Sequence, residues 1–453
     1  MSVEEQNPLA TQKISSLILK FTIPAIISMM VSSLYNIVDQ IFIGQGVGML
    51  GNAATNIAFP VNIICTAAAL LFGIGSASNF NLRSGAGHTE EAKNYAGCGL
   101  SLLVICGVII TAVTLFFLNP LMQVFGATEE VLPYALDYTR ITAIGVPFLT
   151  LTTGGCHLVR ADRSPTFSMV CMLTGAIINT ILDPLFIFGF HMGVRGAAVA
   201  TIISQFCSTV WVLRFLCGKK AVLNLKKSAF KISWKRVRDI VSLGMSGFFM
   251  AFTNSLVQVV CNATLQTWGG DIYVGVMTVL NSVRDIFTMP VHGLTTGASP
   301  VMSFNYGEKA YDRVKKAIKF ITAVCVIYTL AGWGILKLMP EFFIRIFNSD
   351  PELLEKGVPA LHIYFFGFCF MALQFTGQSV FVALGKAKKA TFFSLLRKAI
   401  IVVPLTILLP YVKGLGTDGV FWAEPISNLV GGCACFFTML ATVLPELNGK
   451  PET

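Results

Sequence analysis

Long apolar stretches, separated by short polar gaps, recur along the whole chain of 453 residues. Each stretch is long enough to cross about 30 Å of hydrocarbon as a helix. Only helices and closed barrels satisfy their backbone hydrogen bonds inside a bilayer. The pattern therefore predicts an all-α polytopic membrane protein with twelve transmembrane helices. The stretches lie near residues 16–44, 53–81, 96–118, 133–158, 166–190, 195–217, 239–266, 272–303, 318–339, 358–384, 391–411 and 417–444.

The second six stretches repeat features of the first six. Residues 73–88 (GIGSASNFNLRSGAGH) align with residues 293–308 (GLTTGASPVMSFNYGE), with two glycines coinciding. The longest basic segment, residues 218–238, lies between the halves. We predict an amino-terminal six-helix lobe (1–217), a basic cytoplasmic linker and a carboxy-terminal six-helix lobe (239–453). Repeats in the same orientation are a known architecture for transporters, with the substrate site between the halves.

Composition and charge support a membrane protein and argue against a nucleic-acid partner. Charged residues make up 12% of the chain and mean hydropathy is +0.71, whereas soluble domains carry about 25% charged residues. The net charge of +10 comes from cations in alternate loops, which assigns those loops and both termini to the cytoplasm. We expect a multi-pass protein of the bacterial cytoplasmic membrane, with anionic lipid as its electrostatic partner. The cation-rich loops are 82–95, 159–165, 218–238, 304–317 and 385–390.

Two aspartates lie inside predicted spans of the first half. Asp39 is in the first span, and Asp183 is in the fifth, one helical turn after Asn179. Pro24 interrupts the first span and Pro184 follows Asp183, so both helices should be irregular. A carboxylate in a span is costly, and intramembrane acids commonly mark ion pathways. Two nearby carboxyls would share one proton or, with an amide and a hydroxyl, bind a hard cation. The alternative is a structural hydrogen bond between helices.

The second half contains a different polar set. Arg284 and Asp285 lie mid-way along the eighth span, and Asn254 and Gln258 lie in the seventh. These residues are candidates for a substrate cavity or an internal ion pair. Glu424 begins the twelfth span, where it could lie near the outer surface and be solvated. The twelve cysteines show no C-x-x-C pair, and no nucleotide-binding motif occurs, so no cofactor is expected.

These features together resemble the multidrug and toxic compound extrusion (MATE) family, most closely its MepA-like bacterial branch. The resemblance implies a V-shaped pair of bundles that exports small organic cations in exchange for H⁺ or Na⁺. It also assigns the coupling site to Asp39, Asn179, Asp183 and Thr201, and a helix bend to Pro24; the role of Thr201 rests on the resemblance alone. The segments that carry it are FTIPAI…YNIVDQIFIG (21–44), RADRSPT (160–166), NTILDPLFIFG (179–189), GVRGAAVATIISQ (193–205) and FNYGEKAYDRVKKA (304–317).

One departure from the family pattern concerns the second half. NorM-type members carry an acid in the seventh span, where this chain has Asn254. Within the internal repeat, Asn179 and Asp183 fall opposite Pro404 and Leu408. Ion coupling is therefore predicted only in the first half.

Two other functions are considered. An intramembrane protease would use Ser246 in the string Gly-Met-Ser-Gly, but no histidine motif accompanies it. A lipid-linked oligosaccharide flippase would need a strongly cationic cavity, whereas Arg284 is the main cation within a span besides Arg140. We therefore expect a monomeric secondary transporter, not an enzyme, with a cationic and amphipathic cargo.

Overall fold

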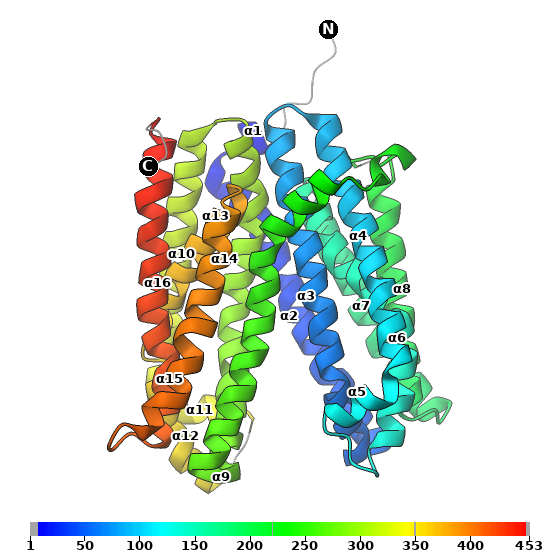
Figure 1. The fold of residues 1–453 in the computed structure, drawn as a ribbon, viewed down its shortest axis with the longest axis vertical. Coiled ribbons are helices and arrows are strands. Elements are labelled where there is room, and N and C mark those ends of the chain that lie inside the picture. Colours follow the sequence, from blue (N-terminus) through cyan, green and yellow to red (C-terminus); the bar gives the residue numbers. More distant parts are fainter. Residues whose placement is uncertain (1–7, 220, 348–349, 450–453) are drawn as a thin grey trace. The chain divides into compact units, whose positions relative to one another are not determined.

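The computed structural model describes residues 8–219, 221–347 and 350–449, and all regular structure in these ranges is helical. Both chain ends and Lys220 of the predicted linker lie outside the described residues. In the first half the helices are α1 (Pro8–Thr11), α2 (Ile14–Val47), α3 (Met49–Gly85), α4 (Thr89–Phe116), α5 (Leu118–Val124), α6 (Leu132–Ala161), α7 (Pro165–Pro184) and α8 (Val194–Leu216). Then follow α9 (Trp234–Gly307), α10 (Tyr311–Leu338), α11 (Pro340–Arg345), α12 (Pro351–Tyr364), α13 (Phe368–Ala383), α14 (Ala387–Leu395), α15 (Val403–Leu408) and α16 (Thr417–Leu447) (Figure 1).

The described helices account for the predicted transmembrane spans. Ten helical segments are long and apolar enough to cross a membrane, and the bent pair α12 and α13 makes an eleventh. The segment α9 is 74 residues long, about 110 Å at 1.5 Å per residue, which exceeds one bilayer several times. Its backbone leaves the helical conformation at Gly270 (φ 71°), and the chain turns back near there in Figure 1. Counting α9 as two spans gives twelve, and the all-α membrane fold is confirmed.

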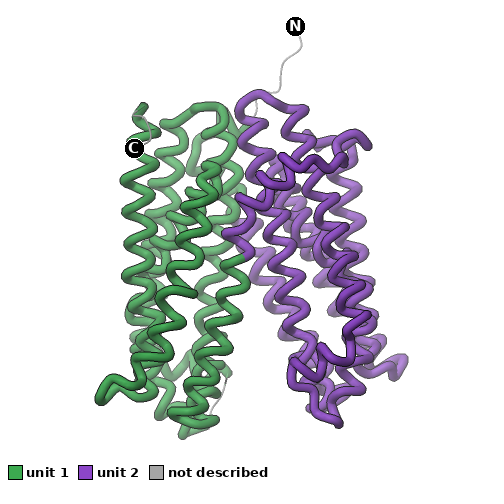
Figure 2. The backbone as a smooth tube through the Cα atoms, in the orientation of Figure 1, with its two compact units in different colours: residues 1–22, 249–453 green, residues 23–248 purple. Residues whose placement is uncertain are grey.

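The chain forms two compact units (Figure 2). Unit 2 consists of residues Ile23–Phe248, and unit 1 consists of Met1–Thr22 together with Phe249–Thr453. Two helices, α2 and α9, pass from one unit into the other without a loop. The predicted division into lobes 1–217 and 239–453 remains a prediction.

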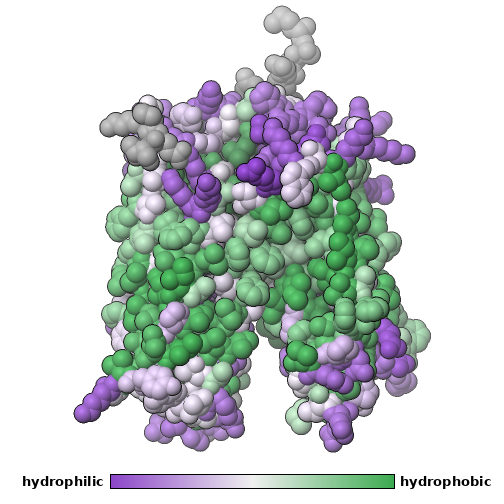
Figure 3. Space-filling model, viewed as in Figure 1, coloured by the Kyte–Doolittle hydropathy of each residue, from purple (hydrophilic) through white to green (hydrophobic). Residues whose placement is uncertain are grey.

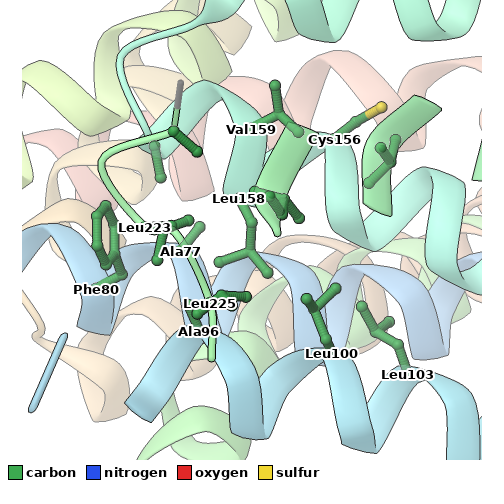
Figure 4. Close-up of a cluster of buried hydrophobic side chains, with 14 of the residues drawn as sticks. Ala77, Phe80, Ala96, Leu100, Leu103, Cys156, Leu158, Val159, Leu223 and Leu225 are labelled. Carbon is green, nitrogen blue, oxygen red and sulfur yellow. The ribbon is translucent and has the colours of Figure 1, made fainter. Parts of the chain in front are cut away.

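Small residues let the helices of unit 2 pack closely. A Cβ added at Gly73 of α3 would lie 2.6 Å from Cα of Gly154 in α6, which is far closer than real side chains approach. A Cβ on Gly244 would lie 1.7 Å from the carbonyl oxygen of Leu71. Alanine, leucine and cysteine side chains fill the remaining space, including Leu100 and Leu158 in the core shown in Figure 4. Such packing uses small residues at helix contacts, as is usual in membranes.

The surface of each unit carries an apolar band between polar ends (Figure 3). Many large apolar side chains are exposed along the helices, among them Ile105, Ile109, Ile327 and Phe437. In water such an exposed surface would be unfavourable, but a lipid environment accepts it. The band is therefore the surface that faces hydrocarbon.

Cation-rich segments meet at one end of each unit. In unit 2, the Asp162 carboxylate accepts backbone N–H groups from Val222 (3.0 Å) and Leu223 (2.7 Å) of the segment before α9. In unit 1, Arg313 donates to the carbonyl oxygens of Leu9 (3.0 Å) and Gln12 (2.7 Å). These contacts tie basic segments to neighbouring parts of the same unit; the side of the membrane that they face stays a prediction.

A second contact in unit 1 joins the last helix to the same polar end. Glu446 of α16 pairs with Lys386 at 2.8 Å and accepts a hydrogen bond from Tyr306. Asn305, the neighbour of Tyr306, donates to the carbonyl oxygen of Leu9 at 3.1 Å. The first described helix and the end of α16 therefore lie at the same end of unit 1.

Two spans contain a π-helical turn. Leu185–Gly189 follows α7 directly after Pro184, and Leu396–Val402 precedes α15, which has Pro404 near its start. Proline has no backbone N–H and disturbs the regular hydrogen-bond ladder, and π turns often occur at functional sites. The two turns occupy corresponding spans of the two halves, the fifth and the eleventh.

Candidate functional site

Two aspartates from different helices meet inside unit 2. Asp39 comes from α2 and is 8% exposed, while Asp183 comes from the end of α7 and is fully buried. Their carboxyl groups lie close enough to interact electrostatically. Two carboxylates repel at this distance, so a proton or a cation stabilises the pair. The structure thus brings together the two acids that the sequence singled out.

Asn179 completes a group of oxygen atoms around the pair. Its Nδ2 donates to Oδ1 of Asp183 at 3.2 Å. Three buried oxygens have no hydrogen-bond partner: Oδ1 of Asp39, Oδ1 of Asn179 and Oδ2 of Asp183. Leaving a buried polar atom unsatisfied costs about 1–3 kcal/mol. Within the described ranges neither aspartate pairs with a lysine or arginine.

The carboxylate and amide oxygens of this group can bind a proton or a hard cation. Carboxylate and amide oxygens are ligands of hard cations such as Na⁺ or Ca²⁺, and a proton shared by the two carboxyls would also satisfy them. The part of the chain that the structure describes contains no group of three or more His, Cys, Asp or Glu side chains placed to hold a metal. The surplus of unpartnered acceptors is the main chemical property of the site.

Thr201 and two tyrosines complete the surroundings. The Thr201 hydroxyl donates to the carbonyl oxygen of Ala197 at 3.0 Å, within its own helix α8, so its role at the cation site stays a prediction. Tyr35 and Tyr138 lie close enough to interact electrostatically with both aspartates. Sequence reasoning missed both tyrosines. Tyr35 is one turn before Asp39 on α2 and could have been found by that spacing.

Pro24 lies inside α2, fifteen residues before Asp39. It cannot donate a backbone hydrogen bond to the carbonyl of Lys20, while the Ser28 hydroxyl donates to the Pro24 carbonyl at 2.7 Å. The boundary between the two compact units falls between Thr22 and Ile23. A weakened backbone ladder thus coincides with the passage of α2 from one unit to the other.

Unit 1 contains a buried ionic network that the sequence-based interpretation missed. Lys398 Nζ lies 2.9 Å from both carboxylate oxygens of Glu424, and Arg397 Nη1 lies 3.2 Å from Oε1. Arg397 Nη1 also donates to Oδ1 of Asn428 at 2.6 Å. All four side chains are buried. The expectation that Glu424 is solvated is therefore wrong, and Arg284 is not the main cation of this half.

Arg284 lies beside this network, at the wall of a small recess. Its Nη1 donates to the Tyr364 hydroxyl at 2.8 Å, and that hydroxyl donates to Oδ1 of Asn281 at 3.2 Å. Its contact with Asp285 is 3.2 Å long, but the Asp285 side chain is 55% exposed against 23% for Arg284. The pair is consequently not the fully internal ion pair that the sequence allowed.

The recess brings predicted and unpredicted residues together. Arg284, Asn254 and Gln258 line it, and Tyr364 and Glu424 complete its polar wall; a role in binding cargo stays a prediction. Its volume is about 10 Å³, close to the minimum that one water molecule needs. Asp285 does not line it.

Ser246, the nucleophile of the protease alternative, is buried in α9. It is two residues from Gly244, where the backbone of α9 packs directly against α3. A peptide bond cannot reach this hydroxyl without separating the two helices. The geometry gives no support to the protease alternative.

Comparison with known proteins identifies the family. The MatE family model matches twice, at residues 24–185 and 248–408, which also confirms the internal repeat. The multidrug export protein MepA of Staphylococcus haemolyticus is 25% identical over 413 residues, 90% of both chains. The FAD transporter of Shewanella oneidensis is 26% identical over 447 residues, 96% of both chains.

Solved structures agree on the fold. A MOP superfamily transporter from Pyrococcus furiosus is 24% identical with a TM-score of 0.92, covering 99% of this chain and 100% of its own. A MATE crystal structure in complex with MaL6 has a TM-score of 0.91 at 24% identity, with 98% and 99% of the chains covered. The double match, the membrane-spanning helices and the shared fold lead to one conclusion: the chain belongs to the MATE family of transporters.

Proposed function

We propose that this protein exports small organic cations across the cytoplasmic membrane in exchange for H⁺ or Na⁺, by alternating access. The observation that supports the proposal is the buried group of Asp39, Asn179 and Asp183 with its three unpartnered oxygens. A cation that enters this group would satisfy acceptors that are otherwise costly to bury. Thr201 is proposed as a further ligand because of the family resemblance.

Ion binding can be coupled to a change of conformation through charge. A bound cation or proton removes net negative charge from the Asp39–Asp183 pair, so the bound and free forms favour different arrangements of α2 and α7. Pro24 weakens α2 and would let it bend. One elementary charge moving inward across 100 mV provides about 2.3 kcal/mol, which corresponds to about a fiftyfold concentration ratio. Ion entry alone can therefore drive export without ATP.

Unit 2 also offers a surface for cargo. A groove of about 540 Å³ runs along α2 on the same helix as Asp39. Amide side chains alternate there with isoleucines, which suits an amphipathic molecule. Its lining residues are Ser33, Asn36, Ile37, Gln40, Ile41, Gly44, Gln45 and Asn52. The relatives are named for different cargoes, a multidrug exporter and an FAD transporter, so cargo identity calls for experiment.

Orientation and assembly are further parts of the proposal. We propose that the cation-rich loops and both termini face the cytoplasm, in keeping with the positive-inside rule. We propose that the protein acts as a monomer. We also propose that it needs no bound cofactor, because the coupling ion provides the driving force.

A lipid-linked oligosaccharide flippase remains the alternative. Arg397 and Lys398 are buried cations that were not considered when the flippase was weighed from the sequence, but both are bound to Glu424. They do not form an open cationic cavity. The acid pair of unit 2 accordingly favours ion-coupled export over flipping.

The proposal is tested in proteoliposomes loaded with a fluorescent organic cation. A pH gradient and a sodium gradient are imposed separately, and dye movement is followed for wild type, Asp39→Asn and Asp183→Asn. We expect wild-type transport with at least one gradient and loss of gradient-driven transport in both variants. Asp137→Asn is the control, because Asp137 forms a half-exposed ion pair with Arg195. Gradient-driven transport at wild-type rates in both Asp39→Asn and Asp183→Asn would refute the coupling site.

A further inference from the structure

We propose that unit 1 holds a second binding site, at Arg284, for an oxyanion of the transported molecule, either a carboxylate or a phosphate group. This inference rests on the proposed transport function and specifies its cargo more closely. The transported molecule would carry a negatively charged group in addition to any cationic part.

The first argument is the charge balance of the buried network. In the described part of unit 1, the network and the adjacent Arg284–Asp285 pair together contain three cations, Arg284, Arg397 and Lys398, and two carboxylates, Asp285 and Glu424. Glu424 is buried and is held by Arg397 and Lys398 at once. Asp285 is more than half exposed, so solvent screens much of its charge. The buried part of the network therefore has an excess of positive charge, which is costly inside a membrane.

The second argument is the supply of hydrogen-bond donors. An arginine has five N–H groups, and the contacts of Arg284 with Asp285 and Tyr364 use Nε, Nη1 and Nη2 once each. Two N–H groups are left for another acceptor. Arginine presents its donors in a planar fork that matches a carboxylate or phosphate. Asn254 and Gln258 line the same recess from an exposed position and can add amide N–H groups.

The third argument is the size of the recess. Its volume admits one atom of about the size of a water oxygen. One oxygen of a carboxylate or phosphate fits there, while the remainder of the molecule stays on the exposed side at Asn254 and Gln258. The Glu424 carboxylate also lines the recess and would repel an anion. Its two cation partners, Arg397 and Lys398, offset that repulsion.

The experiment compares two dyes that differ in one charged group. Rhodamine 110 has a free carboxylate, and rhodamine 123 is its methyl ester; both share the same cationic ring system. Dissociation constants are measured by fluorescence polarisation on the full-length protein in lipid nanodiscs. A charge-assisted hydrogen bond contributes enough to predict about tenfold tighter binding of the carboxylate dye by wild type.

Variants connect that preference to the proposed site. Arg284→Gln should reduce the preference to about one, and Arg284→Lys should keep part of it because the charge remains. Gln258→Ala should reduce it partly. Arg140→Gln is the control, because Arg140 is an exposed arginine of α6 in unit 2 and should leave the preference unchanged.

The possible outcomes separate the inference from the proposed function. Equal binding of both dyes by wild type would overturn the anion site. So would a loss of affinity for both dyes to the same extent in Arg284→Gln, since that indicates a structural role. Arg284-dependent competition by chloride without any dye preference would also overturn it, in favour of a halide site. Failure of ion gradients to drive either dye would refute antiport and leave the binding ratio as an independent result.

Discussion

Removal of the Glu424 charge is the most direct test of the ionic network in unit 1. In Glu424→Gln the amide keeps the shape of the side chain, but Arg397 and Lys398 lose their shared negative partner. Both cations are buried, so bulk water does not screen the charges left unpaired. Breaking a buried ion pair in this way typically costs about 3–5 kcal/mol.

A second variant separates the cost of the unpaired charge from that of the lost contact. Replacing a buried ion pair with apolar groups of similar size is often neutral or stabilising. In Glu424→Gln combined with Lys398→Met one cation is removed together with the carboxylate, and Arg397 keeps its 2.6 Å bond to Asn428. We expect the double variant to recover at least about half of the stability lost in Glu424→Gln.

The assay is the free energy of unfolding in mixed micelles, measured by titration with a denaturing detergent. The four proteins of the double-mutant cycle give the coupling energy of the pair directly. Glu341→Gln serves as the control, since Glu341 pairs with Arg345 on an exposed surface and such pairs contribute little. Additive effects of the two substitutions, with a coupling energy near zero, would refute the reasoning.

Three further predictions follow from contacts at the polar ends and between helices. Burial raises the pKa of Asp162 to about 7, so this carboxyl keeps its proton in the folded protein at pH values where the unfolded chain has lost it. The free energy of unfolding should therefore decrease as the pH rises from about 4 to about 7, and Asp162→Asn should lack this part of the slope in detergent titrations across that range. Gly244→Val should prevent the contact with the Leu71 carbonyl and lower the melting temperature in a thermal-shift assay, while unchanged melting would show that α3 and α9 can separate without cost. Arg313→Ala should remove one of the two side-chain hydrogen bonds to the Leu9 carbonyl, together with the one to the Gln12 carbonyl, and speed amide hydrogen exchange in α1; exchange at the wild-type rate would show that the Arg313 contacts are dispensable.

The fold was predictable because the bilayer imposes strong rules on sequence. The thickness of the hydrocarbon core sets the length of each apolar stretch, and the basic loops indicate in which direction each stretch crosses the membrane. The structure differs from the sequence-based prediction mainly in α9, where two predicted spans are joined at Gly270 with almost no loop. The sequence indicated a short polar gap between these two spans. It did not predict so tight a turn, because the positive φ of Gly270 cannot be inferred from the sequence and no longer polar segment is inserted there.

The acid pair was predictable because an aspartate in an apolar stretch is conspicuous by itself. Asp39 and Asp183 needed no partner to be noticed. Arg397 and Lys398 were equally anomalous in the eleventh stretch but lie close to basic residues of the preceding loop, and so resembled a helix end. Their burial depends on Glu424 in another helix, and a single sequence does not show which distant side chains will meet.

The π-helical turns have a consequence for how these sites could change. A π turn holds about one residue more than the α-helical turn it replaces, and each residue of an α-helix rotates the chain by about 100°. If Leu396–Val402 reverted to α-helix, the side chains on one side of the turn would rotate by about that angle and shift along the helix axis by about 1.5 Å. Lys398 or Arg397 would then point away from its acid, and the same change at Leu185–Gly189 would swing Asp183 relative to the residues that follow. Each half therefore contains a turn whose change from π-helix to α-helix would exchange buried partners by a small local rotation and shift, far smaller than a movement of a whole unit.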